Sequence, residues 1–164
     1  MVIWIIGKSG AGKTFLSQHL FNKIKKKYKK VIWIDGDKFR KKFSKDLGYS
    51  LKDRRKNSAR IQKYCKKFDV KNYIVICSIL SIFREHQKKN RKIYSNYLQI
   101  YLKVNFKLLE LRNNNKIYSR SKQVVGRDIY FPKPFKSDLI IKNTFNKSFL
   151  NNLKKITNNI YERI

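Results

Sequence analysis

The segment GKSGAGKT, residues 7–14, constrains the fold more than any other feature of this chain. It matches the pattern G-x-x-x-x-G-K-[ST], and it lies between the apolar run VIWII and the amphipathic stretch KTFLSQHLFNKIKKK. A strand, a glycine-rich turn and a helix in this order are typical of a P-loop, whose backbone N–H groups surround a phosphate at the positive end of a helix. We therefore expect a nucleoside triphosphate to be bound by Gly7, Lys8, Ser9, Gly10, Ala11, Gly12, Lys13 and Thr14. In this arrangement Lys13 reaches the β- and γ-phosphates and Thr14 binds Mg²⁺.

Apolar, β-branched runs alternate with longer amphipathic stretches along the rest of the chain. The pattern predicts strands at 2–6, 31–34, 73–78, 97–104 and 138–142. It predicts helices at 13–27, 37–44, 53–67, 84–93, 105–112 and 147–162. Such alternation favours the α/β class, with a parallel sheet covered by helices on both faces, in one domain spanning residues 1–164. The polar segment 113–137, which holds both prolines, is expected to form a lid.

The net charge of +31 invites a nucleic-acid-binding interpretation. However, lysines are spread along the whole chain, which is typical of a solvated surface, so we do not expect nucleic acid to be the main partner. No apolar run approaches the ~18 residues that a membrane helix needs, and the opening run is too short for a signal peptide. We therefore expect a cytoplasmic protein that does not bind membranes. Its two cysteines, Cys65 and Cys77, have no metal-site spacing and are expected to be buried, reduced thiols.

Carboxylates are scarce, yet Asp35, Asp37, Asp46 and Asp53 fall within nineteen residues. Asp53 has a plausible alternative role at the start of a helix. Of two apolar, strand-like runs, VIWID ends in an acid, Asp35, whereas YIVICS ends in Ser78, which is not an acid. We therefore expect Asp35 to lie on the Mg²⁺ side with Thr14. A carboxylate beside the γ-phosphate can also take the proton of an acceptor hydroxyl, which suits a small-molecule kinase. The four aspartates together are expected to line the site and to repel a polyanion.

The order of motifs resembles the adenylylsulfate (APS) kinase family. After the P-loop come IDGDKFR, DLGYSLKDRRKNSARI, ICSILSIFR, YLQIYLKV and VVGRDIYFPKPFKSDLIIKN, so the resemblance covers most of the chain. It implies a P-loop NTPase fold with a five-stranded parallel sheet and a mobile lid, and often a homodimer. It also implies ATP-dependent phosphorylation of the 3′-hydroxyl of APS, which gives 3′-phosphoadenylylsulfate.

The resemblance assigns roles to individual residues. The catalytic set would be Lys13, Asp35, Asp37 and Ser81, with Asp37 nearest the acceptor hydroxyl. Ser81 matches a serine that is a phosphoserine position in the family; since in-line transfer needs no covalent serine, we expect it to bind the acceptor. The remaining assignments are acceptor binding by Arg40, Tyr49, Arg54, Asn57, Leu80 and Val124, and ATP binding by Arg112. Arg40 and Arg54 would hold the charged group, and Tyr49 would stack on the base.

The chain also departs from the family pattern in the acceptor region. Ile82 replaces the proline of the FISP motif, and the lid sequence RNNNKIYSRSK is shorter, with Asn115 and Lys116 where Lys-Gly is expected. Val124 replaces the second aromatic residue of the base clamp, and stacking on one aromatic ring is worth ~1–3 kcal/mol. Two alternatives to APS phosphorylation therefore stay open. One is the same chemistry on another nucleotide, such as the cytidine diphosphate derivative cytidine diphosphoramidate; the other is a P-loop nucleic-acid-binding ATPase.

Overall fold

A computed structural model describes residues 1–112 and 123–162 of the chain. Its centre is a five-stranded sheet in the order β2–β3–β1–β4–β5, and every neighbouring pair is parallel. The strands are β1 (Val2–Ile6), β2 (Val31–Asp35), β3 (Ile74–Ile79), β4 (Tyr97–Lys103) and β5 (Leu139–Lys142). All five strands confirm the sequence predictions, and no strand end differs by more than one residue.

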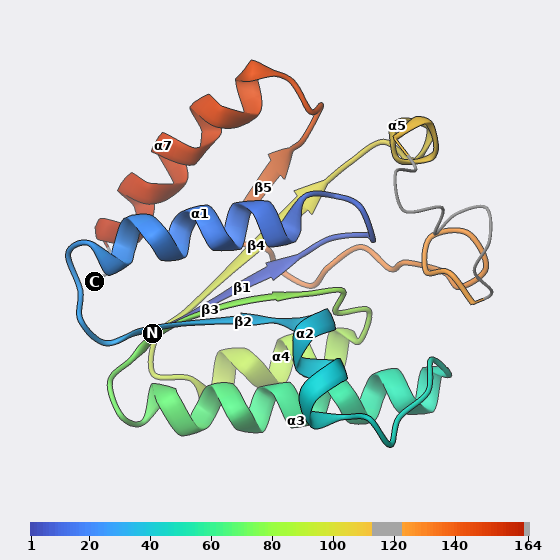
Figure 1. Cartoon of the computed structure of the whole chain (residues 1–164), viewed down its shortest axis with the longest axis horizontal. Coiled ribbons are helices and arrows are strands. Elements are labelled where there is room, and N and C mark those ends of the chain that lie inside the picture. The colour runs from blue at the N-terminus through green and yellow to red at the C-terminus, as the bar shows by residue number, and fades with distance from the viewer. Residues whose placement is uncertain (113–122, 163–164) are drawn as a thin grey trace.

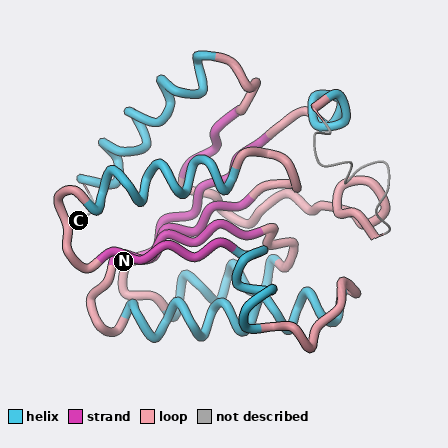
Figure 2. The backbone as a smooth tube through the Cα atoms, in the orientation of Figure 1, coloured by secondary structure: helices cyan, strands magenta, loops and turns pink. Residues whose placement is uncertain are grey.

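Helices cover both faces of the sheet (Figure 1). α1 (Lys13–Lys25) and α7 (Lys147–Tyr161) lie on one face, and α2 (Gly36–Phe43), α3 (Leu51–Asp69) and α4 (Arg84–Ile93) lie on the other. The short helix α5 (Phe106–Leu111) follows β4. Figure 2 shows the strands as the middle layer, with the two groups of helices on either side. The α/β, P-loop class predicted from the sequence is confirmed, and the helix ends differ from prediction by no more than two residues.

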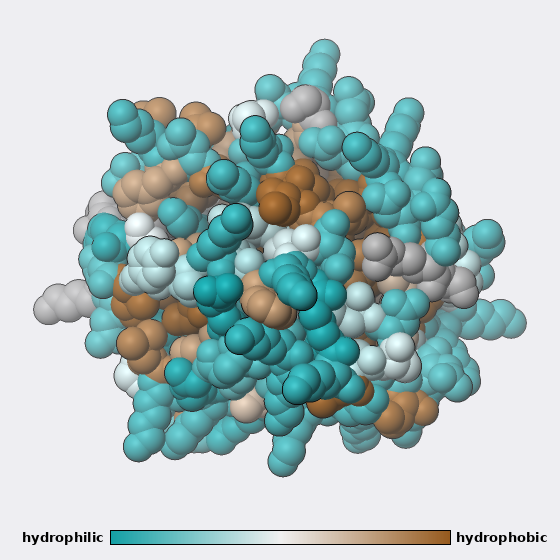
Figure 3. All heavy atoms as spheres, turned by 180° about the vertical axis from the view of Figure 1, so that it is seen from behind, coloured by the Kyte–Doolittle hydropathy of each residue, from teal (hydrophilic) through white to brown (hydrophobic). Residues whose placement is uncertain are grey.

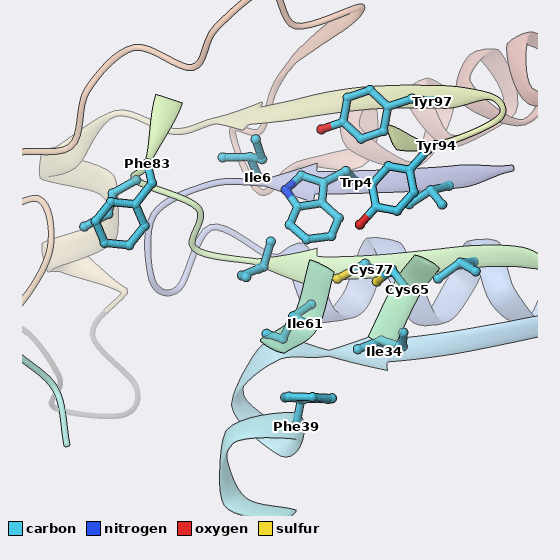
Figure 4. Packing of buried hydrophobic residues seen from close by; sticks show 14 of the residues in the cluster. Trp4, Ile6, Ile34, Phe39, Ile61, Cys65, Cys77, Phe83, Tyr94 and Tyr97 are labelled. Atoms are coloured by element: carbon cyan, nitrogen blue, oxygen red, sulfur yellow. The ribbon is translucent and has the colours of Figure 1, made fainter. Parts of the chain in front are cut away.

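The apolar run VIWII is β1, the central strand, and it is buried on both sides. Val2, Trp4 and Ile6 pack in the cluster toward α3 and α4, which Figure 4 shows from close by, whereas Ile3 and Ile5 pack toward α1 and α7. A strand in the middle of a parallel sheet has no solvent face, which explains the absence of polar alternation in this run.

The two cysteines also confirm their prediction. Cys65 of α3 and Cys77 of β3 are buried in the same cluster as Trp4, and neither forms a disulfide. Burial raises the pKa of the Cys77 thiol, with a smaller contribution from its contact with Cys65. A thiol with a raised pKa stays protonated and unreactive, as expected of a structural cysteine.

The predicted lid falls only partly within the described structure. Residues 113–122 lie outside it, including Asn115 and Lys116. Residues 123–137 contain no helix or extended strand, only a short bridge between Val125 and Ile129. They run as a loop from the end of the undescribed segment toward β5.

Hydrophilic side chains cover most of the face seen in Figure 3, where hydrophobic residues form only scattered patches. This distribution agrees with the interpretation of the lysine excess as a solvated surface. None of the helices in residues 1–112 and 123–162 is long and apolar enough to cross a membrane.

Candidate active site

Because all strands are parallel, their carboxyl ends meet at one edge of the sheet, where α/β proteins bind ligands. The P-loop follows β1 at this edge and leads into α1. A side chain at Gly7 would come within 2.8 Å of the Leu102 carbonyl oxygen, and Gly12 adopts a φ of +91°. These two positions therefore require glycine. The Lys13 ammonium donates to the Lys8 carbonyl at 2.7 Å, which folds its side chain back over the loop.

Asp35, the last residue of β2, lies next to the first turn of α1. The Thr14 hydroxyl donates to one Asp35 carboxylate oxygen at 2.7 Å, and the Ser78 hydroxyl donates to the same oxygen at 3.1 Å. The other oxygen accepts from the backbone N–H groups of Asp37 and Lys38 at 3.1 Å each, which caps α2. The structure thus brings Thr14 and Asp35 together, as the sequence predicted.

The Thr14 and Asp35 oxygens fit Mg²⁺ by their chemistry. Mg²⁺ is usually held by one or two protein oxygens together with phosphate oxygens and waters. Within the described residues no group of three His, Cys, Asp or Glu side chains could hold a metal ion alone. A magnesium ion at Thr14 and Asp35 would therefore depend on the nucleotide phosphates for further ligands.

Lys13 is half-buried, and its partial loss of hydration lowers its pKa from 10.5 to about 8; the nearby Asp37 and Asp35 carboxylates act in the opposite direction. A lysine that is only partly charged near pH 8 makes ATP binding sensitive to pH, because the charged ammonium is the form that attracts phosphate.

The affinity for ATP is therefore expected to fall above about pH 8. Bound ATP must restore the Lys13 proton, so the Kd for ATP should rise by up to about tenfold per pH unit above that pKa. Isothermal titration calorimetry between pH 7.5 and 9.5 measures the change. The control is Lys13→Arg, which stays charged throughout and should show no such rise. A wild-type Kd that does not change over this range would contradict the lowered pKa.

A cavity of about 510 Å³ opens beside the P-loop at the carboxyl edge of the sheet. Residues predicted for both substrates line it: Ser9, Lys13, Thr14, Asp35, Asp37, Arg40, Tyr49, Arg54, Asn57, Leu80, Ser81 and Val124. They come from segments as distant as residues 9 and 124, so the fold brings residues that are far apart in the sequence together around one cavity.

Two arginines flank Tyr49 in this cavity. The guanidinium carbons of Arg40 and Arg54 lie 5.0 and 5.4 Å from the centre of the Tyr49 ring. Arg54 donates to the Tyr49 carbonyl at 2.9 Å and to the Gln123 carbonyl at 3.1 Å. Burial, and secondly the neighbouring Arg40, lower the pKa of the Arg54 guanidinium. Neither arginine forms an ion pair with a carboxylate in the described part of the chain. Paired guanidinium groups of this kind favour an anionic ligand.

Asn57 carries an unsatisfied polar atom at the cavity. Its side chain is buried, and its Oδ1 atom has no hydrogen-bond partner among the described residues. An unpartnered buried acceptor is costly, so it points to a donor group supplied by a ligand. This supports the prediction that Asn57 contacts the acceptor.

Val124 and Arg112 are placed differently from the other predicted residues. Val124 lines the cavity, but it is buried and packs with Leu109, so little of its side chain is available to a base. Arg112 is not a cavity-lining residue; its guanidinium carbon lies 4.2 Å from the centre of the Phe145 ring. The ATP role of Arg112 therefore stays a prediction.

The expectation that all four clustered aspartates line the site is wrong for two of them. Asp46 forms a two-pronged ion pair with Arg60 at 2.6 and 2.7 Å, away from the cavity. Asp53 accepts a hydrogen bond from the Ser50 hydroxyl, and its own N–H donates to that hydroxyl. These bonds form a helix N-cap, which confirms the alternative role of Asp53 at the start of α3.

Several further residues at the cavity were not predicted from the sequence. They are Gly36, Lys41, Ser58, Ser78, Ile79, Phe83, Gln123 and Val125. Only Ser78 had a visible signal, since it ends a predicted strand at the carboxyl edge of the sheet. Gln123 accepts a hydrogen bond from Arg54 through its backbone carbonyl. Every residue has this group, so the residue type at position 123 does not indicate the contact.

The parallel sheet, the P-loop and the acid that faces Thr14 define the class of protein: it is a P-loop kinase. The family model for adenylylsulphate kinase matches residues 1–142. The chain therefore belongs to the adenylylsulfate kinase family, and it is a phosphotransferase.

Curated relatives agree on the chemistry and differ in the acceptor. A cytidine diphosphoramidate kinase of Campylobacter jejuni is 34% identical over 148 residues, covering 87% of this chain and 86% of the relative. An adenylyl-sulfate kinase of Paraburkholderia xenovorans is 28% identical over 147 residues, covering 86% of this chain and 82% of the relative.

The fold also matches solved structures. The APS kinase of Mycobacterium tuberculosis, solved with AMPPNP and APS, superposes with a TM-score of 0.85. It is 21% identical in sequence, and the match covers 96% of this chain and 95% of that one. At this level of identity the likeness supports the fold alone. The identity of the acceptor has to be inferred from the residues that line the cavity.

Proposed function

We propose that the protein transfers the γ-phosphate of ATP to the 3′-hydroxyl of a nucleotide whose other end carries an anionic group. The observation that carries this proposal is the single cavity that joins the P-loop to Asp37, Arg40 and Arg54. The P-loop side fits ATP, and the two guanidinium groups, which form no ion pair with a carboxylate among the described residues, fit the charged end of an acceptor.

The residues of the cavity suit an in-line transfer. Asp37 lines it with an exposed carboxylate, which can orient the acceptor hydroxyl and take its proton as the oxygen bonds to the γ-phosphorus. The bond from that phosphorus to the β–γ bridging oxygen breaks, and ADP leaves. Lys13 stabilises the negative charge on the transferring group. A magnesium ion at Thr14 and Asp35 would neutralise part of the charge on the phosphate oxygens.

Within this reaction we favour a cytidine diphosphate derivative, such as cytidine diphosphoramidate, over APS. Val124 takes the place of an aromatic base-clamp residue and is largely buried against Leu109. Of the two clamp positions only that of Tyr49 is then aromatic, so the stacking that favours a large purine is reduced. The greater identity to the cytidine diphosphoramidate kinase, 34% against 28%, supports the same choice. APS remains the second candidate.

Two substitutions test the base site. Val124→Phe is expected to shift preference toward APS, because a second ring restores stacking worth ~1–3 kcal/mol, or roughly five- to hundredfold in kcat/KM. Tyr49→Ala is expected to weaken both acceptors by a similar factor, since it removes the one stacking ring. The measurement is kcat/KM for APS and for cytidine diphosphoramidate in the wild type and the two variants. ADP release is the signal that reports each reaction.

Tyr130→Ala is the matched control. Tyr130 is an exposed tyrosine in the loop that also holds Val124, and it does not line the cavity. It should retain the wild-type preference. A wild type that strongly prefers APS, together with a Val124→Phe protein of unchanged preference, would contradict the cytidine assignment and leave APS as the acceptor.

The same proposal includes ATP as the phosphate donor, with Mg²⁺. It also includes a cytoplasmic location and a homodimeric state. Size-exclusion chromatography with light scattering separates a monomer of 19.8 kDa from a dimer.

A further inference from the structure

Ser81 occupies an unusual position between β3 and α4. Its φ of +42° lies in the left-handed region that a residue with a side chain seldom adopts. Two buried side chains hold it there. Gln87 Nε2 donates to the Ser81 carbonyl at 2.9 Å, and Trp4 Nε1 donates to the Ser81 hydroxyl at 3.3 Å. Trp4 and Gln87 are both 0% exposed, so these contacts are part of the core.

Gln87 is itself fixed from the other side. Its Oε1 atom accepts from the backbone N–H of Phe135 at 2.6 Å. The backbone of Ser81 is therefore held by an amide that is bonded at both its nitrogen and its oxygen, whereas among the described residues only Trp4 bonds to its hydroxyl. Backbone strain that the surroundings maintain in this way is common at ligand sites.

The direction of the Trp4 bond decides what the hydroxyl can do. An indole N–H only donates, so Ser81 Oγ is the acceptor in this contact and its own proton cannot point toward the Trp4 nitrogen. Figure 4 shows the indole nitrogen turned toward the end of the sheet at which Phe83 lies, the end where the cavity opens. Ser81 lines that cavity, so its proton is available there.

We propose that Trp4 is a positioning residue that holds the Ser81 hydroxyl as a hydrogen-bond donor to an anionic phosphoryl or sulfuryl oxygen of the acceptor. This inference rests on the proposed function, because it needs an acceptor in the cavity. The guanidinium groups of Arg40 and Arg54 line the same cavity, so a neutral donor would complete their contacts with the charged group. Trp4 acts through Ser81 and does not itself line the cavity.

The substitution Trp4→Phe tests this role, since it keeps an aromatic ring and removes the N–H group. The loss of one neutral hydrogen bond predicts a fall of about three- to tenfold in kcat/KM for the acceptor. The KM for ATP should stay at the wild-type value. A purely structural role would instead lower activity toward both substrates.

The chain offers a matched control in its second tryptophan. Trp33 Nε1 donates to the Ser17 hydroxyl at 2.9 Å, and neither residue lines the cavity. Trp33→Phe thus removes the same kind of bond elsewhere, and it should leave the kcat/KM for the acceptor unchanged.

A double-mutant cycle shows whether Trp4 acts through Ser81. Ser81→Ala alone should lower the kcat/KM for the acceptor, and Trp4→Phe added to it should cause no further loss. If Trp4→Phe unfolds the protein, benzothienylalanine at position 4 in the Trp33→Phe background replaces only the N–H by sulfur, and the same fall is expected.

The outcomes separate the two claims. If the wild-type protein phosphorylates neither nucleotide, the proposed function is wrong and this inference is wrong with it. If the wild type is active, the inference alone is contradicted by an unchanged kcat/KM in the Trp4 variants, by an equal loss for ATP, or by independent losses from Trp4→Phe and Ser81→Ala.

Discussion

Replacing Lys13 with alanine is expected to abolish ATP turnover while leaving the fold intact. The ammonium group folds back over the P-loop, and in the proposed reaction it stabilises charge on the transferring phosphoryl group. A preorganised charge of this kind is worth about 3–4 kcal/mol, which corresponds to a loss of roughly 10²–10³-fold in kcat. Since burial already disfavours the charged form of Lys13, its removal should not lower the thermal unfolding temperature.

The control for this variant is Lys25→Ala at the other end of α1, where the lysine is exposed. It should turn over ATP at the wild-type rate. Steady-state ADP release at saturating ATP, with circular dichroism to verify folding, measures both proteins. Near-normal turnover by Lys13→Ala would contradict the assignment of the P-loop.

Asp37→Asn is expected to impair phosphoryl transfer far more than ATP binding. Asp37 lies in the first turn of α2 and lines the cavity, and its backbone N–H donates to Asp35. In the proposed reaction its carboxylate orients or deprotonates the acceptor hydroxyl, a role that contributes roughly 10²–10⁴-fold to the rate. The amide keeps the shape of the side chain and removes its basicity. The expected result is a kcat lower by that factor with a Kd for ATP close to that of the wild type.

Asp46→Asn provides a matched control, because Asp46 belongs to the same acidic group in the sequence but pairs with Arg60 on the surface. Single-turnover transfer and calorimetric ATP binding are measured for both variants. If Asp37→Asn transfers phosphate normally, Asp37 serves only the helix, and Asp35 is then the residue to test as the base.

The sequence predicted the elements of the fold well because their signals are local. The run VIWII has the apolar character of a central strand, and GKSGAGKT carries backbone requirements that Gly7 and Gly12 confirm. Asp35 could be placed beside Thr14 because both lie at the ends of elements that a parallel sheet brings to one edge.

The features that sequence reasoning missed depend on contacts between distant residues. The pairing of Asp46 with Arg60 removes that carboxylate from the site, and nothing in the segment around Asp46 indicates it. The bond from Trp4 to Ser81 joins residues 77 positions apart, and the Gln123 carbonyl that holds Arg54 is a backbone group. Residue types alone carry no information on such partners.

The most direct test of the central claim is to identify the phosphorylated product. The protein is incubated with ATP, Mg²⁺ and either cytidine diphosphoramidate or APS, and the product is examined by phosphorus NMR and mass spectrometry. The account predicts one ADP released for each acceptor that gains one phosphate on its 3′-oxygen, with the cytidine nucleotide as the better substrate. ATP consumption that yields only inorganic phosphate, or that requires nucleic acid and falls steeply with salt, would contradict it.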